Sequence, residues 1–235
     1  AQFAAQCDED RRQLAAIRDA RDEKAAQWFE EHAGEWDDLR RRHSPDAKVE
    51  AALREALAGE ALGDLLDIGT GTGRMAQLFG EVADHVVALD KSLEMLRVAR
   101  ARLQHLPADR VELVQGDFLS LPFEARSFDT VLLHQVLHYA PVPGDPLREA
   151  ARVLRPGGRI AIVDFAAHGH EELRERFQHA RLGFEDDHLA SVLEQTGFAP
   201  EEPLALEGET LEVKIWIARR GEAPRTSTQA RKVAR

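Results

Sequence analysis

Short aliphatic runs alternate with amphipathic helical segments through the middle of this 235-residue chain, and this alternation restricts its fold more than any other feature. The runs are almost continuous in Leu, Val, Ile and Ala, a composition typical of strands that are buried on both faces of a parallel sheet. We therefore expect an α/β fold with a doubly wound sheet. The first five strands are expected at residues 65–68, 86–90, 111–114, 130–134 and 160–164.

The end of the chain departs from this alternation. Residues 198–206 and the alternating run 211–217 are separated only by a short Glu-Gly-Glu turn region, which predicts an antiparallel hairpin. The expected sheet is therefore seven-stranded and mostly parallel, and it finishes in a C-terminal antiparallel hairpin. At the other end, residues 8–42 are rich in strong helix formers and predict one long helix, or two that are broken near Gly34.

Chain length and the position of these patterns predict a single catalytic unit. We expect a helical extension at residues 1–43, the main domain at residues 44–219, and a disordered basic tail at residues 220–235. No apolar run is long enough to cross a bilayer, and the first residues do not resemble a secretion signal. We therefore expect a cytoplasmic protein with no membrane partner.

Charge and cysteine content argue against two further classes of function. The formal net charge is −11, whereas nucleic-acid binding requires concentrated positive charge, so a nucleic-acid partner is not expected for this chain alone. Cys7 is the only cysteine, which excludes an internal disulfide and a site with several thiolate ligands. No other metal-ligand spacing is present, so no metal is expected.

A glycine-rich loop follows the first expected strand, at Asp67-Ile68-Gly69-Thr70-Gly71-Thr72-Gly73. Glycines at this point allow positive φ angles and let a ligand approach the backbone closely, at the edge of the sheet where such folds bind ligands. A dinucleotide fingerprint would require glycine at the position of Arg74, and a P-loop would require Lys followed by Ser or Thr. The loop predicts a ligand site of another kind.

At this motif the chain resembles the class I S-adenosylmethionine-dependent methyltransferases, whose first motif is an acidic residue followed by Gly-x-Gly-x-Gly. The resemblance covers residues 62–219 and is closest to small-molecule enzymes such as those of ubiquinone and menaquinone biosynthesis. It implies a Rossmann-like fold, S-adenosyl-L-methionine as cofactor and S-adenosyl-L-homocysteine as product.

The resemblance also implies a set of cofactor-binding residues. The glycine loop would pack against the methionyl part, with Asp67 supporting its ammonium group, and Asp90 would accept both ribose hydroxyls. The positions after the third expected strand resemble an adenine site, and His134 would lie next to the cofactor. The full set is Asp67, Gly69, Thr70, Gly71, Gly73, Asp90, Lys91, Met95, Gly116, Asp117, Phe118 and His134.

Candidate residues for the acceptor side follow the fourth strand. His138 and Tyr139 are the expected catalytic pair, because an imidazole titrates near neutral pH and is the usual base for an oxygen acid. The alternative is that His138 caps a helix and Tyr139 packs under the loop. An aromatic group lies before the sheet and either shields the reactive sulfonium from water or only packs its own helix. This group is Trp28, Phe29, His32 and Trp36.

Three functions remain in view. The preferred one is transfer of a methyl group to a small-molecule acceptor. The second is a cofactor-sensing domain of a transcription regulator, because the charged N-terminal helix resembles the segment that joins such domains to a winged helix of the arsenical-repressor type. The third, a nicotinamide-dependent dehydrogenase, is disfavoured by Arg74 and by the closing hairpin. A homodimer formed through the N-terminal helices is a further expectation.

Overall fold

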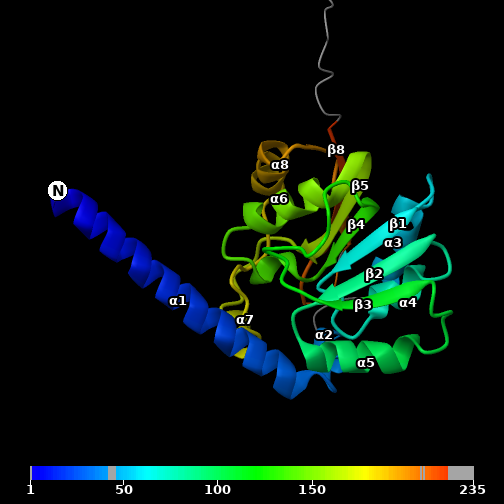
Figure 1. Ribbon diagram of the computed structural model, residues 1–235, viewed down its shortest axis with the longest axis horizontal. Helices are drawn as coiled ribbons and strands as arrows, with labels where there is room; N and C mark the ends of the chain where they lie inside the picture. Colours follow the sequence, from blue (N-terminus) through cyan, green and yellow to red (C-terminus); the bar gives the residue numbers. More distant parts are fainter. Residues whose placement is uncertain (1, 42–45, 207, 209, 222–235) are drawn as a thin grey trace, which may run out of the picture.

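One mixed sheet forms the centre of the computed structural model, which describes residues 2–41, 46–206, 208 and 210–221. The strand order is β3-β2-β1-β4-β5-β8-β6, and β7 also pairs with β8. Strands β1 to β5 are parallel, whereas β8 is antiparallel to β5 (Figure 1). The predicted α/β fold is confirmed. The strands are β1 Asp64–Ile68, β2 His85–Asp90, β3 Val111–Gln115, β4 Phe128–His134, β5 Leu154–Phe165, β6 Phe198–Pro200, β7 Leu204–Leu206 and β8 Val213–Arg220.

The strand count differs from the prediction at one place. Residues 198–206 form two short strands, β6 and β7, and both pair with β8, so the described sheet has eight strands rather than seven. Pro200 and Pro203 lie in this segment, and a proline cannot donate a ladder hydrogen bond. The closing antiparallel arrangement is as predicted, but its first strand is divided.

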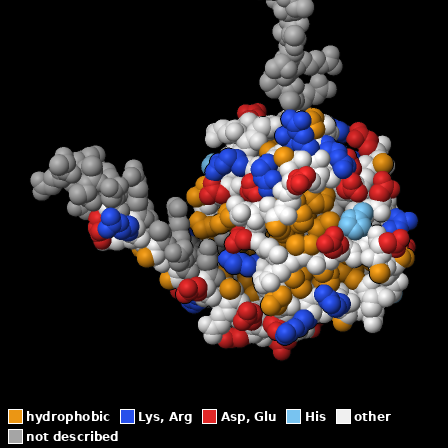
Figure 2. All heavy atoms as spheres, viewed as in Figure 1, with side chains coloured by type: hydrophobic (Ala, Val, Ile, Leu, Met, Phe, Trp, Pro, Cys, Tyr) orange, Lys and Arg blue, Asp and Glu red, His pale blue; other side chains and the backbone are white. Residues whose placement is uncertain are grey.

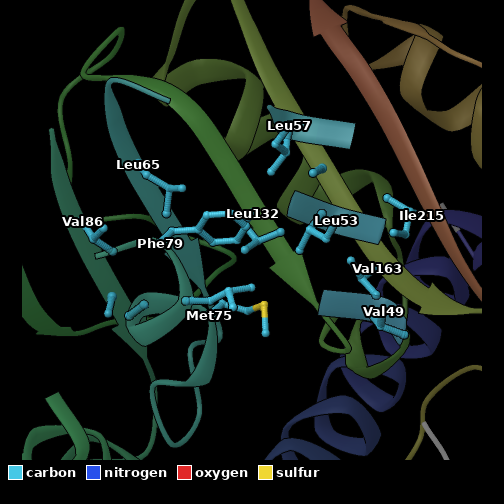
Figure 3. Close-up of a cluster of buried hydrophobic side chains, with 14 of the residues drawn as sticks. Val49, Leu53, Leu57, Leu65, Met75, Phe79, Val86, Leu132, Val163 and Ile215 are labelled. Carbon is cyan, nitrogen blue, oxygen red and sulfur yellow. The ribbon is translucent and has the colours of Figure 1, made fainter. Parts of the chain in front are cut away.

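Helices cover both faces of the sheet. On one face lie α3 (Asp46–Leu57), α4 (Arg74–Phe79) and α5 (Leu93–Leu103), and on the other lie α6 (Gly144–Val153) and α8 (Asp186–Gln195). Figure 3 shows the first core, in which residues of α3 and α4 meet strand residues such as Leu65 and Leu132. Adjacent strand residues alternate between the two cores, as the pleat requires; Leu65 belongs to the first and Leu66 to the second.

The N-terminal extension is broken near Gly34, as one of the two predictions proposed. Helix α1 spans Gln2–His32 and α2 spans Trp36–Arg41. Figure 1 shows the N-terminal half of α1 projecting beyond the domain, while its C-terminal end lies by α5 and α7 (Glu172–Arg176). Among the described helices α1 is the longest, and neither it nor any other combines the length and apolar content needed to cross a bilayer. The predicted tail lies almost wholly outside the described residues.

This topology determines where a ligand can bind. The chain runs outward from β1 to β2 and β3, then returns to place β4 on the other side of β1. Loops at the carboxyl ends of β1 and β4 therefore diverge, and a crevice opens between them. Acidic and basic side chains are interspersed on the face shown in Figure 2, instead of forming a single basic patch there.

Candidate functional site

A pocket lies at this crevice and gathers most of the predicted site residues. The lining comes from β1, β2 and β4 with their loops, from the loop after β3, and from α1 and α2, which close it from the N-terminal side. Of the predicted cofactor set, only Gly73 is not part of the wall. The predicted residues on the wall are Asp67, Gly69, Thr70, Gly71, Asp90, Lys91, Met95, Gly116, Asp117, Phe118, His134 and Tyr139.

The glycine loop has the left-handed backbone that its sequence predicts. Gly69, Gly71 and Gly73 have φ angles of 68°, 55° and 80°. A Cβ atom on Gly69 would lie 2.4 Å from Cγ2 of Val136, so this position requires glycine for close packing as well as for its backbone angle. Gly73 instead lets α4 pack closely on Ala99 of α5, which explains why it supports the loop without lining the pocket.

Asp67 is a buried carboxyl group at the end of β1. It is only 1% exposed, and its Oδ2 accepts a hydrogen bond from Thr70 Oγ1 at 2.6 Å. Its Oδ1 is also buried and has no hydrogen-bond partner among the described residues. Burial raises the pKa of Asp67 to about 7, against the lowering effect of the Thr70 hydrogen bond. Such an oxygen is suited to a cationic partner from a ligand.

Asp90 links the end of β2 to the glycine loop. Its Oδ2 accepts the amide of Gly71 at 2.8 Å and its Oδ1 accepts the amide of Ser92 at 2.9 Å. Burial raises the pKa of Asp90, and these backbone donors act in the opposite direction. Each carboxylate oxygen keeps further lone-pair capacity, so the group can also accept hydroxyl donors from a ligand.

The residues that the sequence predicted for the adenine partly satisfy one another's hydrogen-bonding capacity. Lys91 Nζ lies 3.0 Å from Asp117 Oδ2, and Asp117 Oδ1 accepts the amide of Leu119 at 2.8 Å. Met95 and Phe118 supply apolar surface to the same part of the wall. The Asp117 carboxylate therefore stabilises the turn after β3. It can accept a hydrogen bond from a ligand only with the lone pairs that these two contacts leave free.

Arg40, from α2, is a site residue that the sequence did not reveal. Its side chain is 8% exposed, pairs with Asp46 at 3.0 Å and lies 3.4 Å from Nδ1 of His134, and its Nε is buried without a hydrogen-bond partner among the described residues. Burial and then the charge of Arg40 hold the pKa of His134 well below its usual value. The Arg40-Arg41-Arg42 run offered only a weak signal, because the contact with His134 spans 94 positions.

Of the predicted catalytic pair, Tyr139 lines the pocket and His138 does not. Both belong to the short helix η1 (Leu137–Tyr139), and His138 is 2% exposed. His138 Nδ1 lies 2.7 Å from Asp164 Oδ1, and its amide donates to Asp164 Oδ2 at 3.1 Å. These bonds fix η1 against the end of β5, so His138 positions Tyr139 in this arrangement.

The N-terminal aromatic group divides between the two predicted roles. Phe29 and Trp36 line the pocket, and the Trp36 indole nitrogen lies 3.4 Å from where a Gly71 Cβ would be. Trp28 stacks on His32 with ring centroids 4.5 Å apart and also meets Phe177 edge-on. Phe29 and Trp36 therefore lie at the pocket, whereas Trp28 and His32 are not part of its wall and pack against each other.

Comparison with known families and structures agrees with this geometry. The family described as "Methyltransferase domain" matches residues 66–162, which run from β1 into β5. N-methyltransferase NodS from Bradyrhizobium japonicum, solved with S-adenosyl-L-homocysteine, is similar in structure, with a TM-score of 0.70. The similarity covers 84% of this chain and 99% of that chain at 18% identity, which demonstrates a common fold.

Similar sequences occur among curated proteins. O-methyltransferase rstn1 from Aspergillus nomiae is 32% identical over 181 residues, which are 71% of this chain and 79% of that protein. Demethylmenaquinone methyltransferase from Clavibacter sepedonicus is 42% identical over 115 residues, which are 49% of this chain and 46% of that protein. The chain spans about half the length of several curated relatives that it matches.

Proposed function

The chain belongs to the class I S-adenosylmethionine-dependent methyltransferase family, and on that basis we propose that it binds this cofactor in the pocket and transfers its methyl group to a small-molecule acceptor. The observation that carries the proposal is the junction of the Asp90 carboxylate with the glycine loop, beside a buried Asp67 oxygen that has no partner among the described residues. The bound cofactor would supply an electrophilic methyl group on a sulfonium.

The residues present fit each part of this cofactor. Asp90 would accept the ribose hydroxyls, and the glycines let the ligand approach the main chain. Asp67 would accept from the ammonium group, and we propose that Arg40 receives the carboxylate, because its buried Nε lacks a partner among the described residues. Met95 and Phe118 would cover the adenine.

The protein's part in methyl transfer is mainly alignment and exclusion of water. An in-line displacement needs the acceptor and donor to be held together, and a protonated nucleophile must also lose a proton. Phe29 and Trp36 cover the pocket on the side of the N-terminal helices. Removal of the proton by His138 stays a prediction, since its ring lies behind the wall that Tyr139 forms.

Calorimetric titration tests the proposal without knowledge of the acceptor. S-adenosyl-L-homocysteine should bind the full chain in a one-to-one complex, whereas NAD should not, because Arg74 takes the place of a dinucleotide glycine and is held by Glu50 at 2.6 Å. Folded protein that binds NAD but no S-adenosyl-L-homocysteine would refute the proposal. The acceptor can then be sought in metabolite pools as a compound that gains the mass of one methyl group.

A further inference from the structure

Two residues outside the predicted cofactor set combine unusual backbone geometry with a place on the pocket wall. Non-glycine residues with positive φ among those described are Arg126, Gln135 and Gln178. Arg126 lies on an exposed turn before β4, but Gln135 and Gln178 are both buried and both line the pocket. Left-handed geometry is unfavourable for a residue with a Cβ, and it is concentrated at functional sites.

Gln135 also carries a buried hydrogen-bond donor that is not used within the described structure. Gln135 is 5% exposed, and no described residue accepts a hydrogen bond from its Nε2. The hydroxyl of Tyr139, four residues further along the chain, is likewise buried without a partner among the described residues. Most buried polar groups in folded proteins are paired, so two unpaired donors on one pocket wall indicate a ligand that accepts from them.

The surroundings of these donors are apolar and aromatic. The wall beside them includes Phe29, Val136 and Pro141, and the rings of Phe29 and Tyr139 meet edge-on with centroids 5.0 Å apart. We call this part of the pocket, together with Gln135 and Tyr139, the acceptor chamber. A flat apolar body suits such a wall, since aromatic rings favour edge-to-face and offset contacts.

Charges near the chamber disfavour an ionic acceptor. Arg40, from α2, already pairs with Asp46 and lies against His134, and the charged residue that α1 contributes to the pocket is Glu30. Glu30 would repel an anion. An ammonium group could donate to the oxygen atoms of Gln135 and Tyr139, but it would leave Gln135 Nε2 and the hydroxyl proton of Tyr139 without an acceptor. Burial, followed by the charge of Asp164, raises the pKa of Tyr139, so its hydroxyl keeps its proton at neutral pH.

We propose that the acceptor is an uncharged molecule with a flat apolar body and a carbonyl or hydroxyl oxygen, and that Gln135 and Tyr139 orient it by donating hydrogen bonds to that oxygen. This inference rests on the proposed function, because it assigns the acceptor side of the same pocket. Gln135 and Tyr139 are specificity residues in this account, and His138 with Asp164 positions Tyr139.

A matched series of small aromatic probes tests the proposal on the full chain saturated with S-adenosyl-L-homocysteine. The probes are acetophenone, phenol, benzoate, benzylamine and toluene, with dissociation constants measured by calorimetry. Acetophenone and phenol should bind at least about tenfold more tightly than toluene, benzoate or benzylamine, because a correctly placed polar group that matches its partner dominates such discrimination. Tightest binding by benzoate or benzylamine would overturn the proposal.

Variants then identify the donors. Gln135→Leu and Tyr139→Phe should each remove most of the preference for acetophenone over toluene, while S-adenosyl-L-homocysteine affinity stays within about twofold. Gln135→Gly retains the left-handed backbone without the amide, so it should fold at least as well and lose the same preference. Gln195→Leu, at an exposed position of α8, is the matched control and should keep the preference for acetophenone over toluene.

The outcomes separate the two proposals. A preference that survives in Gln135→Gly and in Tyr139→Phe contradicts the acceptor assignment even when S-adenosyl-L-homocysteine binds well. Failure of S-adenosyl-L-homocysteine to bind the folded wild-type chain contradicts the proposed function itself. Binding of S-adenosyl-L-homocysteine to the wild-type chain is therefore measured before any probe is added.

Discussion

The carboxylate of Asp90 accepts a hydrogen bond from the amide of Gly71 at 2.8 Å, which fixes the end of β2 against the glycine loop. Asp90→Ala should therefore weaken S-adenosyl-L-homocysteine binding by about 1–3 kcal/mol, or roughly fivefold to 150-fold, through loss of charge-assisted hydrogen bonds. Calorimetry measures the change. Asp145→Ala, which changes an exposed side chain at the start of α6, is the control. Equal affinity of Asp90→Ala and wild type would remove Asp90 from the site.

Asp67 should make both stability and cofactor affinity depend on pH. Its folded pKa of about 7 exceeds its ordinary value of 3.8, so the folded chain binds an extra proton between these values. The free energy of unfolding contributed by this group therefore falls as pH rises from about 4 to about 7, by on the order of a few kcal/mol. Asp67→Asn should not show this loss of unfolding free energy when urea unfolding is measured at pH 5 and at pH 8.

Cofactor binding should follow the opposite trend. The ionised carboxylate is the form that pairs with an ammonium group, so S-adenosyl-L-homocysteine affinity should rise between pH 6 and pH 8 in the wild-type chain. The same titrations on Asp67→Asn should show a flatter dependence. If affinity depended on pH equally steeply in the two proteins, a group other than Asp67 would control the pH dependence of binding.

Arg40 should discriminate between ligands that have the amino-acid part of the cofactor and ligands that lack it. Arg40→Met should weaken S-adenosyl-L-homocysteine binding at least about tenfold, since hydrogen bonds to charged groups contribute about 1.5–3 kcal/mol. 5′-Methylthioadenosine has no carboxylate, and its affinity should change less than twofold. Equal losses for both ligands would mean that Arg40 supports the fold of the pocket and does not bind the carboxylate.

The two roles considered for His138 predict different kinetics. If His138 positions Tyr139 through Asp164, His138→Asn should raise KM for the acceptor and leave the pH dependence of kcat unchanged. If it is the base, kcat should fall and its acidic limb should move. Steady-state kinetics with an identified acceptor separate these results, and S-adenosyl-L-homocysteine affinity should be retained in either case.

Local patterns predicted the sheet, and the residues that they assigned to a cofactor, except Gly73, lie together on one pocket wall. Both results have a physical reason. The glycine loop and Asp90 lie at strand ends, and the parallel sheet brings those ends together whatever the details of packing. The division of residues 198–206 into two strands was missed because the effect of Pro200 and Pro203 on pairing depends on the register with β8.

The acceptor side was less accessible from sequence because it depends on contacts between distant segments. Arg40 reaches His134 only after α2 has folded over the strand ends. The direction of His138 is set by Asp164, 26 positions later, which turns the ring away from the pocket. Gln135 has no local motif, and its left-handed backbone is visible only in the folded chain. The regulatory alternative and the homodimer remain untested predictions.

A crystal structure of the full chain grown with S-adenosyl-L-homocysteine tests the central claim most directly. The account predicts the ligand in the pocket between β1 and β4, with its ribose hydroxyls on Asp90, its ammonium group on Asp67 and its carboxylate on Arg40. An empty pocket at saturating ligand, or a ligand whose ribose lies away from Asp90, would contradict it.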